Sequence, residues 1–441
     1  MDEDKVTTFS ARIPSQPLFI VTIDPANVEH ILKVNFENYV KGEYFTERVS
    51  DVLGTGIFAV DGDKWYSQRK ITSTLFNVRN FETNMTDVFQ THGRELVSIL
   101  DASLGTPIDA QNIFHRFTLD SIGDIAFGRN IGSLKDEHNA FAAAWDRTNE
   151  HIVFRFFSPI RALMPYSAGG KKIKVDIPFI KEFASEIVRD RRAAIRDGSA
   201  ADKADLLTLM LNRRDENGNE FTDDFLTDMV LNIILAGRDT TAQSLTWTIM
   251  LLAQHPEVCA RLRAEVDDVV GDDIPSFRDV QAMDYMYAVI SESVRLYPSV
   301  PRDPKIARKQ DTLPDGTVVP AGAAVVYFPY GMGRCTDIWG PDARSFKPER
   351  FLREEDGGIK RVKPSAYKFS AFQAGPRTCL GQNMAYLEES MVLAMVLQRY
   401  TFELVPGQKF KIRLNLTSPM DNGLNVVFKH RTDKKIAPLS H

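Results

Sequence analysis

Apolar side chains recur every three to four residues through most of the chain, which is the spacing of one face of an α-helix. Segments with this pattern lie at 26–34, from 81 to about 196, at 285–296 and at 382–397. Alternation typical of strands is confined to 18–23, to short stretches within 312–327 and to the residues after Tyr400. We therefore expect a mainly α fold with a small β region, built from the two ends of the chain and the segment around 298–327.

The strongest helical pattern begins after Thr222 and ends at His255-Pro256. Thr222 is a good N-cap, and the acidic residues after it suit the first turn of a helix. The middle of this pattern is interrupted by Ala236-Gly237-Arg238-Asp239-Thr240-Thr241. Glycine and threonine are poor helix formers, and a threonine hydroxyl can bind the carbonyl four residues back. We expect a polar notch in a long, otherwise apolar helix.

Two stretches have no regular period. Residues 42–63 are rich in glycine and aromatic side chains, and we expect an irregular loop there. Residues 213–220 are polar, and we expect a solvated loop.

Composition narrows the class of protein. The net charge of −5 gives no reason to expect a nucleic-acid partner. Three widely spaced cysteines argue against a disulfide framework and favour a reducing compartment. The sequence has no run of about 18 apolar residues, so we expect no transmembrane helix. Because no linker-like stretch divides the 441 residues, we expect one domain over 1–441.

Cys379 lies in a loop between Gly375 and Gly381, directly before a predicted helix. Unpaired N–H groups and the helix dipole favour a thiolate there, and Arg377 could hold an anionic group beside it. Zinc and iron–sulfur sites need several closely spaced cysteine or histidine ligands, which this sequence lacks. A single axial thiolate on haem iron fits, and the alternative is a buried cysteine in a turn.

The residues from Phe372 to Gly381 resemble the haem-binding signature of the cytochrome P450 family, Phe-x-x-Gly-x-Arg-x-Cys-x-Gly, at every fixed position. Three further motifs resemble that family in its order, from about residue 18 onward. They are the pair Trp65-x-x-x-Arg69, the notch 236–241, and Glu292-x-x-Arg295 with the later Phe-x-Pro-Glu-Arg350-Phe.

The resemblance implies the cytochrome P450 fold and a haem-thiolate monooxygenase. Haem b would be bound through Cys379, and O2 would be the co-substrate. The resemblance assigns Asp239 and Thr240 to catalysis, Thr240 holding the oxygen unit or a water and Asp239 linking it to outside protons. The residues that would bind the cofactor are Cys379, Trp65, Arg69, Arg377, Lys305, Phe372 and Gly381. A structural triad would consist of Glu292, Arg295 and Arg350.

Three segments together look like those of plant and fungal fatty-acid omega-hydroxylases: 53–65, 295–301 and the cysteine loop. Attack at a chain end needs a narrow apolar channel. The resemblance implies that the apolar segment around 154–166 lines its entrance, although this segment could equally be part of the core. The candidate channel residues are Ile57, Phe58, Leu235, Ala236, Val300 and Met420. The same residues could instead line a pocket for another lipophile. Ala236 stands where some omega-hydroxylases carry a glutamate esterified to haem, so that link is not expected.

Electrons would come from an NADPH-dependent reductase, because no flavin or nicotinamide motif follows Tyr400. Its acidic surface could dock on basic residues near the cysteine motifs, or these could be only a solvated face. The basic residues are Lys64, Arg69, Lys70, Lys360, Arg361, Lys363 and Lys368. We expect a monomer. Eukaryotic members of the family usually begin with a membrane anchor, so either the enzyme is soluble or the chain is truncated, and we favour truncation. With an anchor, the native protein would lie at the cytoplasmic face of the endoplasmic reticulum.

Two other functions remain open. A lipid-hydroperoxide isomerase or dehydratase would share the fold and need no reductase, but such enzymes usually lose the Asp-Thr pair. A non-catalytic haem-binding protein is the third possibility.

Overall fold

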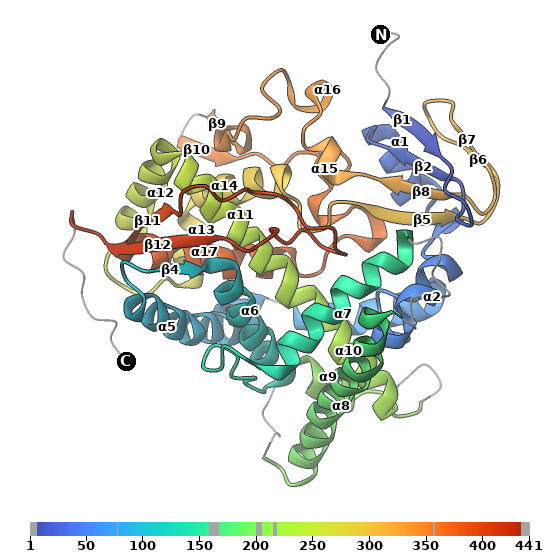
Figure 1. Ribbon diagram of the computed structural model, residues 1–441, viewed down its shortest axis with the longest axis horizontal. Coiled ribbons are helices and arrows are strands. Elements are labelled where there is room, and N and C mark those ends of the chain that lie inside the picture. Colours follow the sequence, from blue (N-terminus) through green and yellow to red (C-terminus); the bar gives the residue numbers. More distant parts are fainter. Residues whose placement is uncertain are drawn as a thin grey trace.

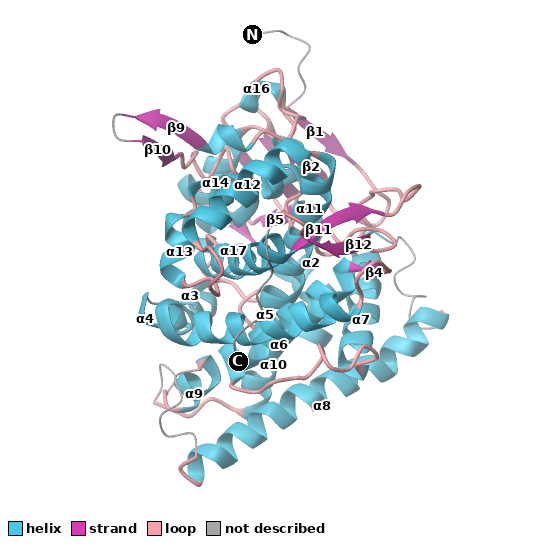
Figure 2. Cartoon of the chain, turned by 90° about the vertical axis from the view of Figure 1, so that its left-hand side faces the viewer, coloured by secondary structure: helices cyan, strands magenta, loops and turns pink. Residues whose placement is uncertain are grey.

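The computed structural model describes residues 7–76, 78–157, 167–199, 205–214, 218–355 and 358–433. The fold is mainly helical with small sheets, as the sequence predicts (Figures 1 and 2). The helices are α1 Pro25–Glu29, α2 Gly42–Leu53, α3 Gly62–Thr72, α4 Val78–Asn80, α5 Thr86–Ala102, α6 Ala110–Phe127, α7 Ala140–Phe157, α8 Ala168–Arg196, α9 Leu206–Leu211, α10 Asp223–Ile234, α11 Thr240–Gln254, α12 Pro256–Val269, α13 Phe277–Ala282, α14 Asp284–Leu296, α15 Pro329–Met332, α16 Thr336–Trp339 and α17 Gln382–Arg399.

The strands form small sheets at the edges of the helical body. They are β1 Thr8–Ala11, β2 Phe19–Thr22, β3 Tyr39–Val40, β4 Pro107–Asp109, β5 Asp303–Ala307, β6 Asp311–Thr312, β7 Val318–Val319, β8 Ala324–Tyr327, β9 Leu352–Glu355, β10 Gly358–Arg361, β11 Tyr400–Leu404 and β12 Asn425–His430. Part of the predicted entrance segment, residues 158–166, and part of the predicted polar loop, residues 215–217, lie outside the described residues.

Strands come from the two ends of the chain and from the segment around 298–327, as expected, but the two ends belong to different sheets. The N-terminal strands join the middle of the chain in a five-stranded sheet with the order β1-β2-β8-β5-β3. The C-terminal strands form a separate sheet, β11-β12-β4, on the other side of the helices (Figure 1). Its third strand, Pro107–Asp109, pairs with β12 across more than 300 residues, a long-range contact that alternation cannot reveal.

The long helix runs through the core as α10, a π-helical turn at Leu235–Asp239, and α11. Thr222 caps it, its hydroxyl accepting the N–H of Phe225 at 3.3 Å, and it ends at Gln254 as predicted. The predicted notch is present, because the Thr240 hydroxyl donates to the carbonyl of Ala236 at 2.6 Å. The π turn opens the helix by one residue and redirects the side chains around it.

Much of the stretch predicted to be an irregular loop is helical. Residues 42–53 form α2, and only about eight residues separate it from α3. The Asp61 carboxylate accepts the N–H groups of Lys41 and Gly42, both at 3.0 Å, and so satisfies the start of α2. The overlooked signal was the spacing of Val49, Val52 and Leu53, which are all buried.

Candidate active site

Cys379 lies at the wall of a large internal cavity of about 1650 Å³, a volume that includes its open mouth. The Cys379 N–H donates to the carbonyl of Phe372 at 2.9 Å, which closes the loop. Gly375 has a φ of +65°, and a Cβ there would lie 2.0 Å from the Leu32 carbonyl oxygen, so only glycine fits. The Cys379 side chain lies inside the protein, and it is accessible because it faces the cavity.

The sequence predicts that the helix N-terminus favours a thiolate at Cys379, but the surroundings of the sulfur oppose this. Burial raises the pKa of the Cys379 thiol, and this outweighs the opposing N–H groups of Gly381 and Gln382 and the charge of Arg69. The helix N-terminus is therefore not enough to favour a thiolate. A cation bonded to the sulfur would supply the missing stabilisation.

The central helix supplies a second part of the cavity lining. Ala236, Gly237 and Thr240 all line the cavity. A Cβ at Gly237 would lie 2.5 Å from the Ile122 side chain, so this glycine lets α6 pack closely against the notch. The notch therefore faces the same space as the Cys379 sulfur.

Four of the six predicted channel residues line this cavity: Ile57, Phe58, Ala236 and Val300. Leu235 and Met420 do not. Leu235, the first residue of the π turn, packs against the main core. Met420 is fully buried elsewhere, and its backbone is held by the side-chain amide of Gln111.

Trp65, Arg69 and Arg377 meet at the cavity, as the motifs implied. The Arg377 guanidinium lies 4.4 Å from the centroid of the Trp65 ring, and Arg69 donates to the carbonyl of Thr378 at 2.7 Å. Burial lowers the pKa of both guanidinium groups, and Arg377 is partly compensated by Asp61 at 2.7 Å. These donors suit an anion.

A buried charge cluster adjoins them. The carboxylate of Asp303 accepts hydrogen bonds from Lys41 at 2.8 Å, Lys305 at 3.0 Å, the Tyr327 hydroxyl at 3.0 Å and the Gln373 amide at 2.7 Å. Lys41, Tyr327 and Gln373 line the cavity, whereas Lys305 lies behind Asp303. Sequence reasoning named only Lys305. Lys41 could not be found by a motif, because its partner is 262 residues away.

The donor set fits haem. Lys41 and Lys305 share the Asp303 carboxylate, Arg377 pairs with Asp61, and Arg69 donates to the carbonyl of Thr378. Four cations therefore adjoin two carboxylates, which leaves positive charge for the two propionates of a haem. Burial lowers the pKa of Lys305 to about 7, and an added anion would favour its charged form. One thiol and a cavity large enough for a flat ligand complete the fit.

Asp239 and Thr240 are adjacent in the chain but face different spaces. Thr240 lines the large cavity. The Asp239 carboxylate instead accepts hydrogen bonds from Arg238 at 2.7 Å, Trp145 at 3.3 Å and Asn149 at 3.1 Å. Burial raises the pKa of Asp239, although Arg238 opposes this. The pair therefore spans the thickness of the helix.

The third motif is a buried ion-pair triad. Glu292 lies 2.6 Å from Arg295 and 3.3 Å from Arg350, and none of the three lines the large cavity. Arg295 also donates to the carbonyls of Gly333 and Ala343. These contacts hold the segment before the cysteine loop in place and indicate that the three residues have a structural role.

Glu389 is a further titratable group that motif reasoning missed. It lines the large cavity and accepts hydrogen bonds from Ser244 at 2.7 Å and Thr248 at 2.8 Å. Burial raises its pKa to about 7. The network ties α17, which follows Cys379, to α11.

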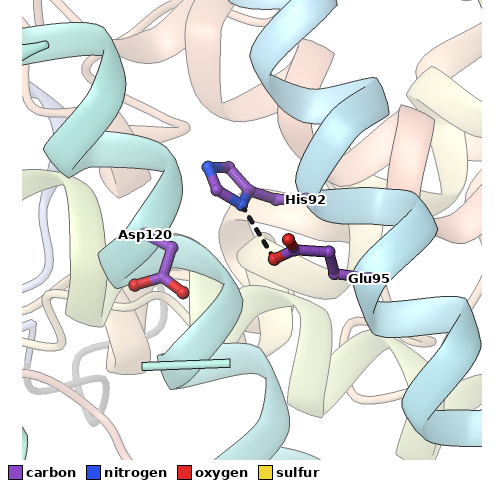
Figure 3. A group of neighbouring side chains, drawn as sticks. All are labelled: His92, Glu95 and Asp120. Atoms are coloured by element: carbon purple, nitrogen blue, oxygen red, sulfur yellow. Dashed lines mark hydrogen bonds and ion pairs between the residues drawn. The ribbon is translucent and has the colours of Figure 1, made fainter. Parts of the chain in front are cut away.

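His92, Glu95 and Asp120 lie close enough to suggest a metal site (Figure 3). Their contacts give a simpler account. The buried His92 ring lies 2.7 Å from Asp124 and 3.5 Å from Glu95, and Asp120 already accepts the N–H groups of segment 133–134. An imidazolium between two carboxylates joins α5 to α6 without a metal.

A mainly helical domain has one cysteine facing a large cavity, beside donors that suit an anion, and this arrangement fits a cofactor with a single thiolate ligand. Comparison with known protein families identifies the family. The family described as Cytochrome P450 matches residues 7–425. The chain therefore belongs to the cytochrome P450 family and is a cytochrome P450 monooxygenase, which implies haem, a reductase and a small-molecule substrate.

Several plant proteins are similar to this chain. Cytochrome P450 86B1 of Arabidopsis thaliana is 38% identical, over 94% of this chain and 78% of its own. Cytochrome P450 704C1 of Pinus taeda is 37% identical, over 92% and 84%. The solved haem domain of cytochrome P450DA covers 96% of this chain with a TM-score of 0.82 and 22% identity, which shows the fold. Within the described residues, no helix is long and apolar enough to span a membrane.

Proposed function

We propose that this chain binds haem b through Cys379 and hydroxylates a fatty acid near its omega end. The observation that carries the proposal is that one cavity is lined by Cys379, by the Thr240 notch and by apolar side chains. Haem iron with a thiolate ligand would supply activation of O2 with cleavage of the O–O bond. The net reaction adds one oxygen atom to the substrate and releases the other as water, with electrons from NADPH through a reductase.

The protein residues have separate tasks. Trp65, Arg69, Arg377 and Lys41 would hold the two propionates by charge-assisted hydrogen bonds. Thr240 would hold a water or oxygen by its hydroxyl, which already opens the helix at Ala236. Asp239 would take up protons from the other side of the helix.

The substrate class rests on the apolar lining and on the sequence resemblance. Ile57, Phe58 and Val300 line the same cavity as the notch. Apolar walls of this kind would bind an alkyl chain and exclude water. A narrow end would admit a terminal methyl group and crowd out the inner methylene groups.

The reductase would approach the side of the molecule that carries the basic residues named above. Lys64, Lys70 and Lys363 are exposed and suit an acidic partner. Arg361 is already paired with Asp284 at 2.5 Å and Lys360 with Glu355 at 2.8 Å, so these two contribute less free charge. If the native protein carries an anchor, we place it at the cytoplasmic face of the endoplasmic reticulum.

The first test is the carbon monoxide difference spectrum of the reduced, haem-loaded protein. A strongly red-shifted Soret band is expected, and its loss in Cys379→Ser would assign the ligand. Fatty acids of graded length should then shift the spin state, and reductase-dependent oxygen uptake should yield a terminal alcohol. Conversion of lipid hydroperoxides without a reductase would instead favour the isomerase function, and haem binding without either reaction a non-catalytic protein.

A further inference from the structure

The turn that follows α2, residues 54–59, supplies Ile57 and Phe58 to the wall of the large cavity. It has few backbone hydrogen bonds of its own, such as the one from the N–H of Ala59 to the carbonyl of Gly56 at 2.9 Å. Its other polar backbone groups need partners on neighbouring elements, because an unpaired buried group is costly. Those partners determine where the two wall residues lie.

Two side chains of α10 hold this turn by its backbone. The Asn232 amide donates to the carbonyl of Leu53 at 2.8 Å and accepts the N–H of Phe58 at 3.2 Å, so it joins the two ends of the turn. One helical turn earlier, the Asp228 carboxylate accepts the N–H of Thr55 at 2.9 Å. Asn232 is fully buried and does not itself line the cavity. Its amide therefore holds the cavity wall from behind.

Two glycines of the turn match these two side chains of α10. A Cβ at Gly54 would lie 1.9 Å from a carboxylate oxygen of Asp228. A Cβ at Gly56 would lie 2.0 Å from the Nδ2 atom of Asn232. The φ of Gly56 is not positive, so the contact requires its small size and not its conformational freedom. The backbone of the turn thus lies directly on the two helix side chains.

Asn232 differs from the other residues that hold the turn. Asp228 and Gln68 of α3 both bind the backbone of Thr55, which does not line the cavity. Asn232 binds the backbone of Phe58, which does. The Phe58 side chain is 36% exposed, so few contacts would keep it in place if this hydrogen bond were lost.

We propose that Asn232 is a positioning residue that fixes Ile57 and Phe58 in the cavity wall and so directs hydroxylation to the end of the substrate chain. The inference rests on the proposed function and adds to it a residue that the substrate does not touch. Loss of the amide leaves the Phe58 N–H and the Leu53 carbonyl without this partner, and the turn moves outward. The wider channel then admits inner methylene groups to the reacting position.

The first experiment measures amide hydrogen exchange in the haem-loaded protein and needs no turnover. In Asn232→Ala the Phe58 N–H should exchange about tenfold faster, because it loses its acceptor. The matched control is Asn27→Ala, which removes another fully buried amide, bound to Thr22 and Asp315, and should leave exchange at Phe58 unchanged. Equal exchange at Phe58 in the wild type and in Asn232→Ala would overturn the proposal.

The second experiment compares terminal with subterminal alcohols formed from lauric acid and from palmitic acid. The ratio should fall by about tenfold in Asn232→Ala, since a shaped apolar pocket distinguishes one methylene group by at least that factor. Asn27→Ala should keep the wild-type ratio. An equal ratio in both variants would contradict the positioning role. If the wild type forms no alcohol, the proposed function fails and the specificity role with it, while the exchange measurement still decides whether Asn232 holds the turn.

A further variant approaches the same contact from the turn. The methyl group of Gly56→Ala would press on the Asn232 amide, so exchange at Phe58 and the product ratio should both change as in Asn232→Ala. In the double variant the methyl group occupies space that the amide has left, so the two effects should be less than additive. Strict additivity would show that the two residues do not act on one another and would argue against the proposal.

Discussion

The Lys41 ammonium group lies 2.8 Å from the Asp303 carboxylate, and both side chains are buried. The pair joins the start of α2 to strand β5 beside the two arginines at the large cavity. Because Lys305 shares the same carboxylate, this cluster carries a surplus positive charge that a bound anion would neutralise.

Replacement of Lys41 by methionine should therefore weaken both the fold and haem retention. Loss of one partner from a buried ion pair costs about 3–5 kcal/mol, and Lys305 would recover part of this at Asp303. Urea unfolding of the haem-loaded protein and the rate of haem loss to a scavenger protein measure the two effects. Lys33→Met, which breaks an exposed pair with Glu29, is the control and should change neither. Wild-type haem retention in Lys41→Met would remove Lys41 from the cofactor site.

Thr240→Ala should uncouple oxygen consumption from product formation. The variant loses the hydroxyl at the notch, so protons and water are no longer held there, while Cys379 and the propionate donors are untouched. We expect NADPH oxidation to continue, hydrogen peroxide release to rise, and the yield of hydroxylated product to fall by about tenfold or more. Thr240→Ser retains the hydroxyl and should recover coupling. Full coupling in Thr240→Ala would contradict the assignment.

Phe58→Ala should move hydroxylation inward along a fatty acid. Phe58 lines the large cavity, and removal of its ring would let inner methylene groups reach the reacting position. The ratio of terminal to subterminal alcohols, measured by mass spectrometry, gives the answer. Leu235→Ala is the matched control, because Leu235 packs in the core away from the cavity. An unchanged ratio in Phe58→Ala would argue against a role in the channel.

The His92 group should make stability depend on pH. Burial lowers the pKa of His92, but the hydrogen bond and charge of Asp124, with Asp120 and Glu95, outweigh burial and raise it. A raised folded-state pKa contributes stability that is fully present below the unfolded value near 6.5 and is lost as pH rises through the folded value. Urea unfolding from pH 5 to 9 should show this loss in the wild type.

In His92→Gln that part of the pH dependence should be absent. Replacement of the exposed His138 by glutamine should leave the profile unchanged. A wild-type profile that is flat over this range, or a profile unaltered in His92→Gln, would show that the imidazolium is not formed.

Local sequence was sufficient for the parts of the protein that depend on local chemistry. Helix periodicity, the Thr222 cap and the notch at Thr240 were all predicted, because capping and backbone hydrogen bonds reach only three or four residues. The cysteine loop was recognisable for the same reason. Gly375, which has a positive φ, and Cys379 lie within a few residues of each other in this loop.

Tertiary structure decided what depends on contacts across the chain. Strand β12 pairs with β4, and Lys41 pairs with Asp303, although the partners are far apart in the sequence. Asp239 and Thr240 are neighbours in the sequence, yet they line different cavities. A linear pattern of residues encodes neither kind of relationship. The charge state of Cys379 also followed from burial and not from its place at a helix start. Desolvation and long-range pairing are properties of the packed molecule, so the sequence named the reactive groups and the fold determined their surroundings.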